Sequence, residues 1–207
     1  MKVNTRNQKI FRLVEMAMLI ALIFVMQDLG TLASTPFRAV GIEFSFVLIP
    51  IVVGAFVLGT VQGAILGFVF VAMTVVLTLT APGSMTYILF TERPVMYVIV
   101  AMVKAIAAGL CSGLIYRGLD KLMKGKAIYL RTVLASATAP IINTGIFLLG
   151  MVCFFSNVIA EKWAGGANIF LFLVGLIGLN FIIEFGINVV LSPAIVRIVD
   201  TVKMKKK

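Results

Sequence analysis

Residues 95–114 read VMYVIVAMVKAIAAGLCSGL, a run that only Lys104 and Ser112 interrupt with polar side chains. An α-helix needs about 20 apolar residues to cross about 30 Å of hydrocarbon, and this run supplies them. Strands of a membrane barrel would instead be shorter and would alternate apolar and polar positions. The run therefore predicts a membrane-spanning helix.

The rest of the chain has the same apolar character. Of its 207 residues, 61% are hydrophobic and only 13% are charged, whereas about a quarter of the residues in a soluble domain are charged. Six apolar segments are expected to be helices: 10–29, 44–60, 61–81, 94–116, 130–155 and 169–196. The predicted fold is an all-α membrane protein with six transmembrane helices, and residues 1–207 are expected to form a single integral membrane domain.

The first segment has the basic start and apolar run of a secretory signal peptide. Glu15 interrupts the start of the apolar run, and residues 32–34 (LAS) make a weak cleavage site. We therefore expect this segment to be retained as the first span.

Lysines and arginines are unevenly distributed between the two sides of the expected spans. Of the 18, 14 lie near the chain ends or in the stretch 117–131; Arg38, Arg93 and Lys162 lie on the other side, and Lys104 lies within a span. Cytoplasmic loops are enriched in lysine and arginine, so both termini are predicted to be cytoplasmic. Because topology explains the net charge of +10, no nucleic-acid partner is expected.

Three loops are expected on the outer side, over residues 30–43, 82–93 and 156–168, and all three are short and polar. The last one carries Trp163, the only tryptophan. This residue is either an anchor in the membrane interface or part of a flap over a site.

The composition argues against several kinds of metal-binding and catalytic site. The chain has no histidine, which is the commonest metal ligand and the commonest acid–base group at neutral pH. Cys111 and Cys153 lie in different apolar runs and are expected to be small buried side chains. The sequence also lacks a G-x-x-x-x-G-K-[ST] phosphate loop. We therefore expect no metal, no cofactor, no catalytic site and no ATP hydrolysis by this chain.

Two charged residues, Lys104 and Glu184, are expected near the middle of the membrane, where each costs at least about 2.5 kcal/mol. Asn143 lies at similar depth, and Asn180, Glu184 and Asn188 share one helical face because they recur every four residues. Either these groups join the helices around a Lys–Glu pair, or they line a cavity for a small hydrophilic ligand. One cation and several amides from three spans favour the cavity.

Small residues recur every four positions in three of the segments. The stripes are Ala17 and Ala21; Gly59, Gly63 and Gly67; and Gly109 and Gly113. Such stripes let helices approach closely. The glycines are expected to pack within this bundle, whereas the alanine stripe serves either this bundle or another membrane protein.

Five stretches together carry a family resemblance. They are Ala17-x-x-x-Ala21, Gly41-Ile-Glu43-Phe-Ser45 followed by Ile49-Pro50, residues 58–67 (LGTVQGAILG), Ile142-Asn143-Thr144-Gly145, and Asn180-x-x-x-Glu184. With the size and the six expected spans, they resemble the substrate-binding S components of energy-coupling factor (ECF) vitamin transporters. One departure is Thr60, where many members have proline.

The resemblance implies a protein of the prokaryotic plasma membrane that captures one vitamin outside the cell and delivers it by toppling in the membrane. Its implied partners are a transmembrane coupling protein, on which Ala17 and Ala21 would dock, and two ATPase subunits. The ligand site would be built from the outer loops and the fourth to sixth helices. The implied substrate-binding residues are Glu43, Lys104, Asn143, Trp163, Asn180 and Glu184.

A buried cation without an evident aromatic cage suits a small carboxylate with amide and hydroxyl groups, and pantothenate fits this description. The region from Pro94-Val-Met-Tyr97 to Phe154-Phe155 also resembles the pantothenate members of the family. Riboflavin is the second choice, because residues 41–50 and the region of Asn143 resemble its S components as well. A flavin would stack on phenylalanine or tyrosine.

Two other classes of function stay open. In a stand-alone ion-coupled carrier, Lys104 and Glu184 would exchange protons as substrate binds, and transport would need no ATPase partner. An intramembrane enzyme is disfavoured because the sequence shows no nucleophile–base pair and no metal cluster.

Overall fold

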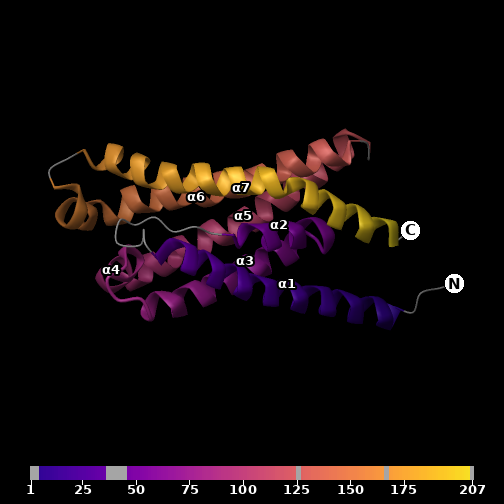
Figure 1. Ribbon diagram of the computed structural model, residues 1–207, viewed down its shortest axis with the longest axis horizontal. Helices are drawn as coiled ribbons and strands as arrows, with labels where there is room; N and C mark the ends of the chain where they lie inside the picture. Colours follow the sequence, from indigo (N-terminus) through magenta and orange to yellow (C-terminus); the bar gives the residue numbers. More distant parts are fainter. Residues whose placement is uncertain (1–4, 36–45, 125–126, 166–167, 206–207) are drawn as a thin grey trace.

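The computed structural model describes residues 5–35, 46–124, 127–165 and 168–205. They form α1 (Thr5–Ser34), α2 (Leu48–Val57), α3 (Thr60–Leu79), α4 (Met85–Glu92), α5 (Pro94–Leu122), α6 (Ile128–Ile159), the short π-helix η2 (Ala160–Ala164) and α7 (Ile169–Lys205). The long helices lie side by side in one elongated bundle (Figure 1). The all-α prediction is confirmed for the described residues.

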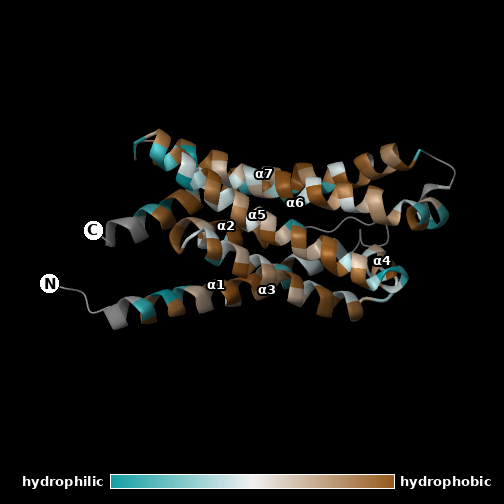
Figure 2. Cartoon of the chain, turned by 180° about the vertical axis from the view of Figure 1, so that it is seen from behind, coloured by the Kyte–Doolittle hydropathy of each residue, from teal (hydrophilic) through white to brown (hydrophobic). Residues whose placement is uncertain are grey.

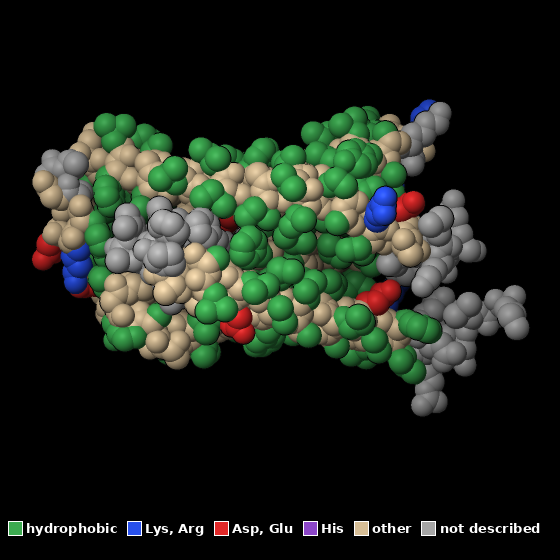
Figure 3. Space-filling view, in the orientation of Figure 1, with side chains coloured by type: hydrophobic (Ala, Val, Ile, Leu, Met, Phe, Trp, Pro, Cys, Tyr) green, Lys and Arg blue, Asp and Glu red, His purple; other side chains and the backbone are tan. Residues whose placement is uncertain are grey.

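Five of the described helices are long and apolar enough to cross a membrane. They cover Lys9–Ser34, Thr60–Leu79, Pro94–Leu122, Ile128–Trp163 and Ile169–Thr201. Hydrophobic residues run along the bundle and hydrophilic residues gather toward its ends (Figure 2). In the space-filling view, apolar side chains cover the length of the visible face (Figure 3). This is the surface of a multi-pass membrane protein.

The second predicted span, 44–60, contains the ten-residue helix α2. Ten residues rise about 15 Å, half of the hydrocarbon thickness of about 30 Å, so the count of six spans is not confirmed. Eight residues of α2 are buried, including Pro50. Their side chains form a core cluster with residues of α5, α6 and α7, so α2 fills the interior of the bundle.

Two segments predicted as loops are largely helical. Residues 85–92 form α4, which begins where the Ser84 Oγ accepts a hydrogen bond of 3.2 Å from the backbone N–H of Tyr87. Met85 and Leu89 of α4 are buried in a second core cluster. In the segment 156–168, α6 continues to Ile159 and η2 to Ala164. Burial of apolar positions against the bundle stabilises these short extensions.

The start of α1 and the end of α7 lie at the same end of the bundle, together with the connection between α5 and α6 (Figure 1). The described basic residues near these helix ends therefore gather at one end of the bundle, while α4 and η2 lie at the other.

The helices α3 and α5 cross at two of the glycine stripes. A Cβ added at Gly67 would lie 2.5 Å from the carbonyl oxygen of Ala105, and one at Gly63 would lie 3.0 Å from that of Gly109. These distances leave no room for a side chain, so the backbones of the two helices are in direct contact. The prediction that the glycines pack within the bundle is confirmed.

We expect Gly109→Ala to destabilise the bundle, because the new Cβ would collide with the backbone of Gly63, which cannot rotate away. Overpacking costs about 1–3 kcal/mol, and a backbone collision lies at the upper end of that range. The gain in helix propensity offsets only about 1 kcal/mol of this cost. Thermal denaturation in detergent should therefore give a lower Tm.

Gly118→Ala is the matched control on the same helix, since nothing lies within 4 Å of a Cβ at that position. Its Tm should equal or exceed that of the wild type. Equal Tm values for the two alanine variants would contradict the close crossing.

A buried arginine joins α6 to α5 and, through an aromatic pair, to α2. Arg131 is 3% exposed, pairs with Asp120 and holds its guanidinium 5.2 Å from the ring centroid of Tyr116. Tyr116 in turn stacks on Phe56, with 4.2 Å between ring centroids. A carboxylate and an aromatic face thus compensate the buried charge.

Removing Asp120 should destabilise the protein more than removing Arg131. Asp120→Ala leaves a buried cation without its carboxylate, which costs about 3–5 kcal/mol. Arg131→Met leaves a carboxylate whose side chain is 39% exposed and reaches water. Asp200→Ala, at an exposed position of α7, is the control. A larger loss of Tm in Arg131→Met than in Asp120→Ala would contradict this account.

Candidate functional site

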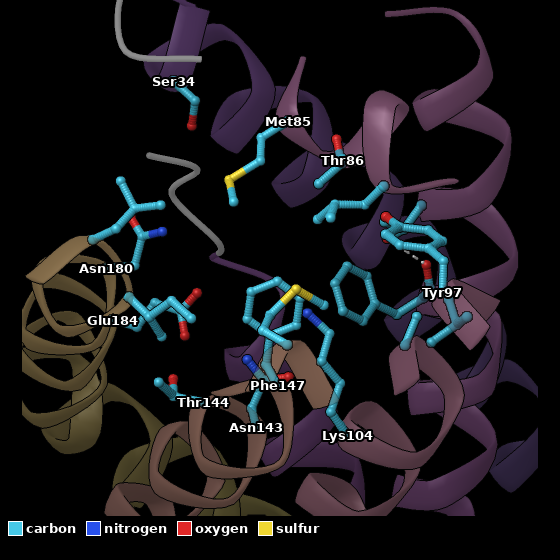
Figure 4. Close-up of a pocket in the computed structure, with 18 of the residues that line it drawn as sticks. Ser34, Met85, Thr86, Tyr97, Lys104, Asn143, Thr144, Phe147, Asn180 and Glu184 are labelled. Carbon is cyan, nitrogen blue, oxygen red and sulfur yellow. Dashed lines mark hydrogen bonds between the residues drawn. The ribbon is translucent and has the colours of Figure 1, made fainter. Parts of the chain in front are cut away.

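A cavity of about 120 Å³ lies between the helices, in the half of the bundle that contains α4 (Figures 1 and 4). The helices α1, α3, α4, α5, α6 and α7 all contribute to its wall. Its polar lining consists of Gln27, Thr31, Ser34, Thr74, Thr86, Tyr97, Lys104, Asn143, Thr144, Asn180 and Glu184. Phe70, Phe147 and several aliphatic side chains complete the wall. The cavity thus combines polar groups with apolar surface, as ligand pockets do.

Four of the six predicted binding residues meet in this cavity. They are Lys104 from α5, Asn143 from α6, and Asn180 and Glu184 from α7. Lys104 and Glu184 approach the space from opposite sides, and Asn143 lies between them (Figure 4). Residues from three segments far apart in the sequence therefore converge at one depth of the bundle.

The cation of this group lies against an aromatic face and within electrostatic range of a carboxyl group. The Nζ of Lys104 lies 4.3 Å from the ring centroid of Phe147, and Lys104 also interacts electrostatically with Glu184. The side chain of Asn143 lines the same part of the cavity (Figure 4). These contacts lower the cost of keeping a lysine inside the membrane.

Three oxygen atoms around the cavity are buried and lack a hydrogen-bond partner in the described part of the chain. They are Oδ1 of Asn143, Oδ1 of Asn180 and Oε2 of Glu184. Leaving a buried acceptor without a donor costs about 1–3 kcal/mol. A molecule that donates hydrogen bonds here would relieve that cost, so these atoms favour a ligand with hydroxyl or N–H groups.

The sequence-based reasoning missed the contribution of α1 to the cavity. Gln27, Thr31 and Ser34 line the wall from this helix. They are spaced four and three residues apart, which places them on one face of the helix. A polar face of this kind on an otherwise apolar helix indicates a polar cavity or a polar contact with another helix. Thr86 was missed for a different reason, because it lies on α4, in a segment predicted as a loop.

Two predicted binding residues remain, and the structure describes one of them. Glu43 is outside the described residues. Trp163 is half-buried in η2 and does not line the cavity, but it packs against the second core cluster, which shares Met85, Leu89 and Met151 with the cavity wall. Asn188 donates a hydrogen bond of 2.9 Å from Nδ2 to the backbone carbonyl of Glu184, so it supports the helix one turn beyond the cavity.

The alanine stripe lies on the outer surface of α1. Ala17 and Ala21 are both exposed, as are the neighbouring Met18 and Leu22. The stripe is therefore not used for packing within the described bundle.

The sequence also matches a model of a known protein family. The model describes the ECF transporter, substrate-specific component, and it matches residues 11–196. The chain belongs to this family. No curated protein sequence matches it significantly. Members of the family, the S components, are substrate-binding subunits of membrane transporters and are not enzymes. The matched range includes every residue that lines the cavity.

Proposed function

We propose that this S component binds a small carboxylate vitamin, with pantothenate as the best match, in the cavity around Lys104. The observation that carries the proposal is the convergence of Lys104 with the amides of Asn143 and Asn180 and the carboxyl of Glu184. A lysine supplies a cation for a carboxylate, and the amides supply donors and acceptors for hydroxyl and amide groups.

Pantothenate matches this lining group by group. It carries one carboxylate, one amide and two hydroxyls, and its two methyl groups suit the apolar part of the wall formed by Met85, Leu89 and Met151. Riboflavin is the second candidate, because Phe70, Tyr97 and Phe147 offer aromatic faces for stacking.

We place the chain ends in the cytoplasm of a prokaryotic cell, with residues 1–207 forming one domain that passes six times through the plasma membrane. The gathering of the described basic residues at one end of the bundle supports this orientation. The cavity, whose wall includes Met85, Thr86 and Leu89 of α4, then lies toward the outer side, where a subunit that captures substrate from outside needs it.

The exposed stripe of Ala17 and Ala21 is the proposed docking surface for the transmembrane coupling protein, which acts together with two ATPase subunits. Small side chains on a lipid-facing helix allow a partner helix to approach closely. The same helix lines the cavity through Gln27, Thr31 and Ser34. The helix α1 would thus connect the docking surface to the substrate.

The experiment that tests this function is uptake of radiolabelled pantothenate into proteoliposomes. The S component is reconstituted with or without the coupling protein and the two ATPases, and ATP is enclosed on the side that holds the ATPases. We expect uptake only with the complete module and ATP. Equal uptake by the S component alone would favour the ion-coupled carrier, for which the electrostatic interaction of Lys104 with Glu184 is the supporting observation.

A further inference from the structure

We infer that the substrate lies across the cavity with a fixed polarity, its anionic group against Lys104 on α5 and its hydroxyl groups against Asn180 and Glu184 on α7. This inference rests on the proposed function, because it takes a hydroxylated carboxylate as the ligand. It goes beyond the proposed function by stating which wall of the cavity binds which end of the substrate. It also assigns Asn180 and Glu184 as the residues that select for hydroxyl groups.

The first argument is electrostatic. Lys104 and Glu184 stand on opposite sides of the cavity (Figure 4), inside a bundle whose interior screens charges less than water does. A ligand carboxylate is attracted to the lysine and repelled by the carboxyl group of Glu184. The reverse orientation would bring two carboxyl groups together and leave Lys104 facing neutral hydroxyls.

The second argument concerns hydrogen-bond donors. Oδ1 of Asn180 and Oε2 of Glu184 are buried acceptors that lack a donor in the described part of the chain. Both residues line the cavity from α7, one helical turn apart. A hydroxyl group donates a hydrogen bond, whereas a carboxylate only accepts. The α7 wall therefore fits the hydroxyl end of the ligand and rejects the carboxylate end.

Two analogues of pantothenate separate the ends of the ligand. Panthenol keeps both hydroxyls but replaces the carboxylate by a neutral alcohol. N-(3,3-dimethylbutanoyl)-β-alanine keeps the carboxylate but lacks both hydroxyls. Calorimetric titration of the purified protein should show that each analogue binds the wild type about tenfold more weakly than pantothenate, or worse, because each loses a hydrogen bond to a charged or buried partner.

The variants should then respond selectively. In Lys104→Met, pantothenate should bind no better than panthenol, while both should still bind better than their counterparts without hydroxyls. In Asn180→Leu and Glu184→Leu, pantothenate should bind no better than the analogue without hydroxyls, while the preference for pantothenate over panthenol persists. Asn180→Leu removes no charge, so it still tests the inference if Glu184→Leu does not fold.

Three outcomes would overturn the inference. If Lys104→Met removes the preference for hydroxyls, the polarity is reversed. If all variants weaken the three ligands equally, the cavity imposes no polarity, although the proposed substrate stands. If the wild type does not bind pantothenate at all, the proposed substrate fails, and the assignment fails with it.

Discussion

Lys104→Met is expected to lower the affinity for pantothenate by about 30-fold or more while leaving the bundle folded. The substitution removes the cation that the ligand carboxylate requires, and truncating one partner of a buried charge pair costs about 2–5 kcal/mol. Methionine keeps the length and the apolar stem that packs near Phe147. Isothermal titration calorimetry of the purified variant measures the loss, and thermal denaturation reports whether the fold is retained.

Lys121→Met is the matched control for this variant. It makes the same substitution on the same helix, at an exposed position near the other end of the bundle and outside the residues that line the cavity. Its affinity should equal that of the wild type. Unchanged affinity for pantothenate in a folded Lys104→Met variant would show that the ligand does not bind at Lys104.

The second large effect is expected in transport rather than in binding. Replacing Ala17 and Ala21 together by tryptophan should reduce ATP-driven uptake to background, because two large side chains would hold a partner helix away from α1. Pantothenate affinity should stay within about twofold of the wild type, since both alanines are exposed and neither lines the cavity. Proteoliposome uptake and calorimetry on the same preparation measure the two quantities.

Ala33→Trp serves as the control for the docking surface. Ala33 is also exposed on α1, about three turns from the stripe and near the opposite end of the helix. This variant should keep both uptake and binding. Normal uptake by the double tryptophan variant would remove the docking proposal, whereas loss of binding would show that α1 shapes the cavity more directly than proposed.

The charged and amide residues of the cavity could be predicted from the sequence, because a charged or polar side chain inside the membrane costs free energy. A lysine or a glutamate inside a long apolar run stands out, and its spacing from neighbouring asparagines fixes the helical face. Lys104, Asn143, Asn180 and Glu184 were found in this way, and the structure brings all four to one cavity. The same logic places Asn188 on that face, but hydropathy cannot tell that it lies beyond the cavity.

Other parts of the architecture depend on packing that the sequence pattern does not show. The apolar run 44–60 reads as a short span, yet α2 is ten residues long and buried among three other helices. The helix α4 is short, and burial of Met85 and Leu89 stabilises it more than its local sequence does. On α1, the spacing of Gln27, Thr31 and Ser34 places them on one helical face, but it does not tell whether that face meets a cavity or another helix.

The most direct test of the central claim is calorimetric titration of the purified S component with pantothenate, with riboflavin and other vitamins as a comparison panel. Trp163, the only tryptophan, provides an independent fluorescence signal for the same titration. The account predicts saturable binding of pantothenate to one site at sub-micromolar concentration, and much weaker binding of the others. Saturable binding of riboflavin in its place, or no saturable binding of any vitamin by either method, would contradict it.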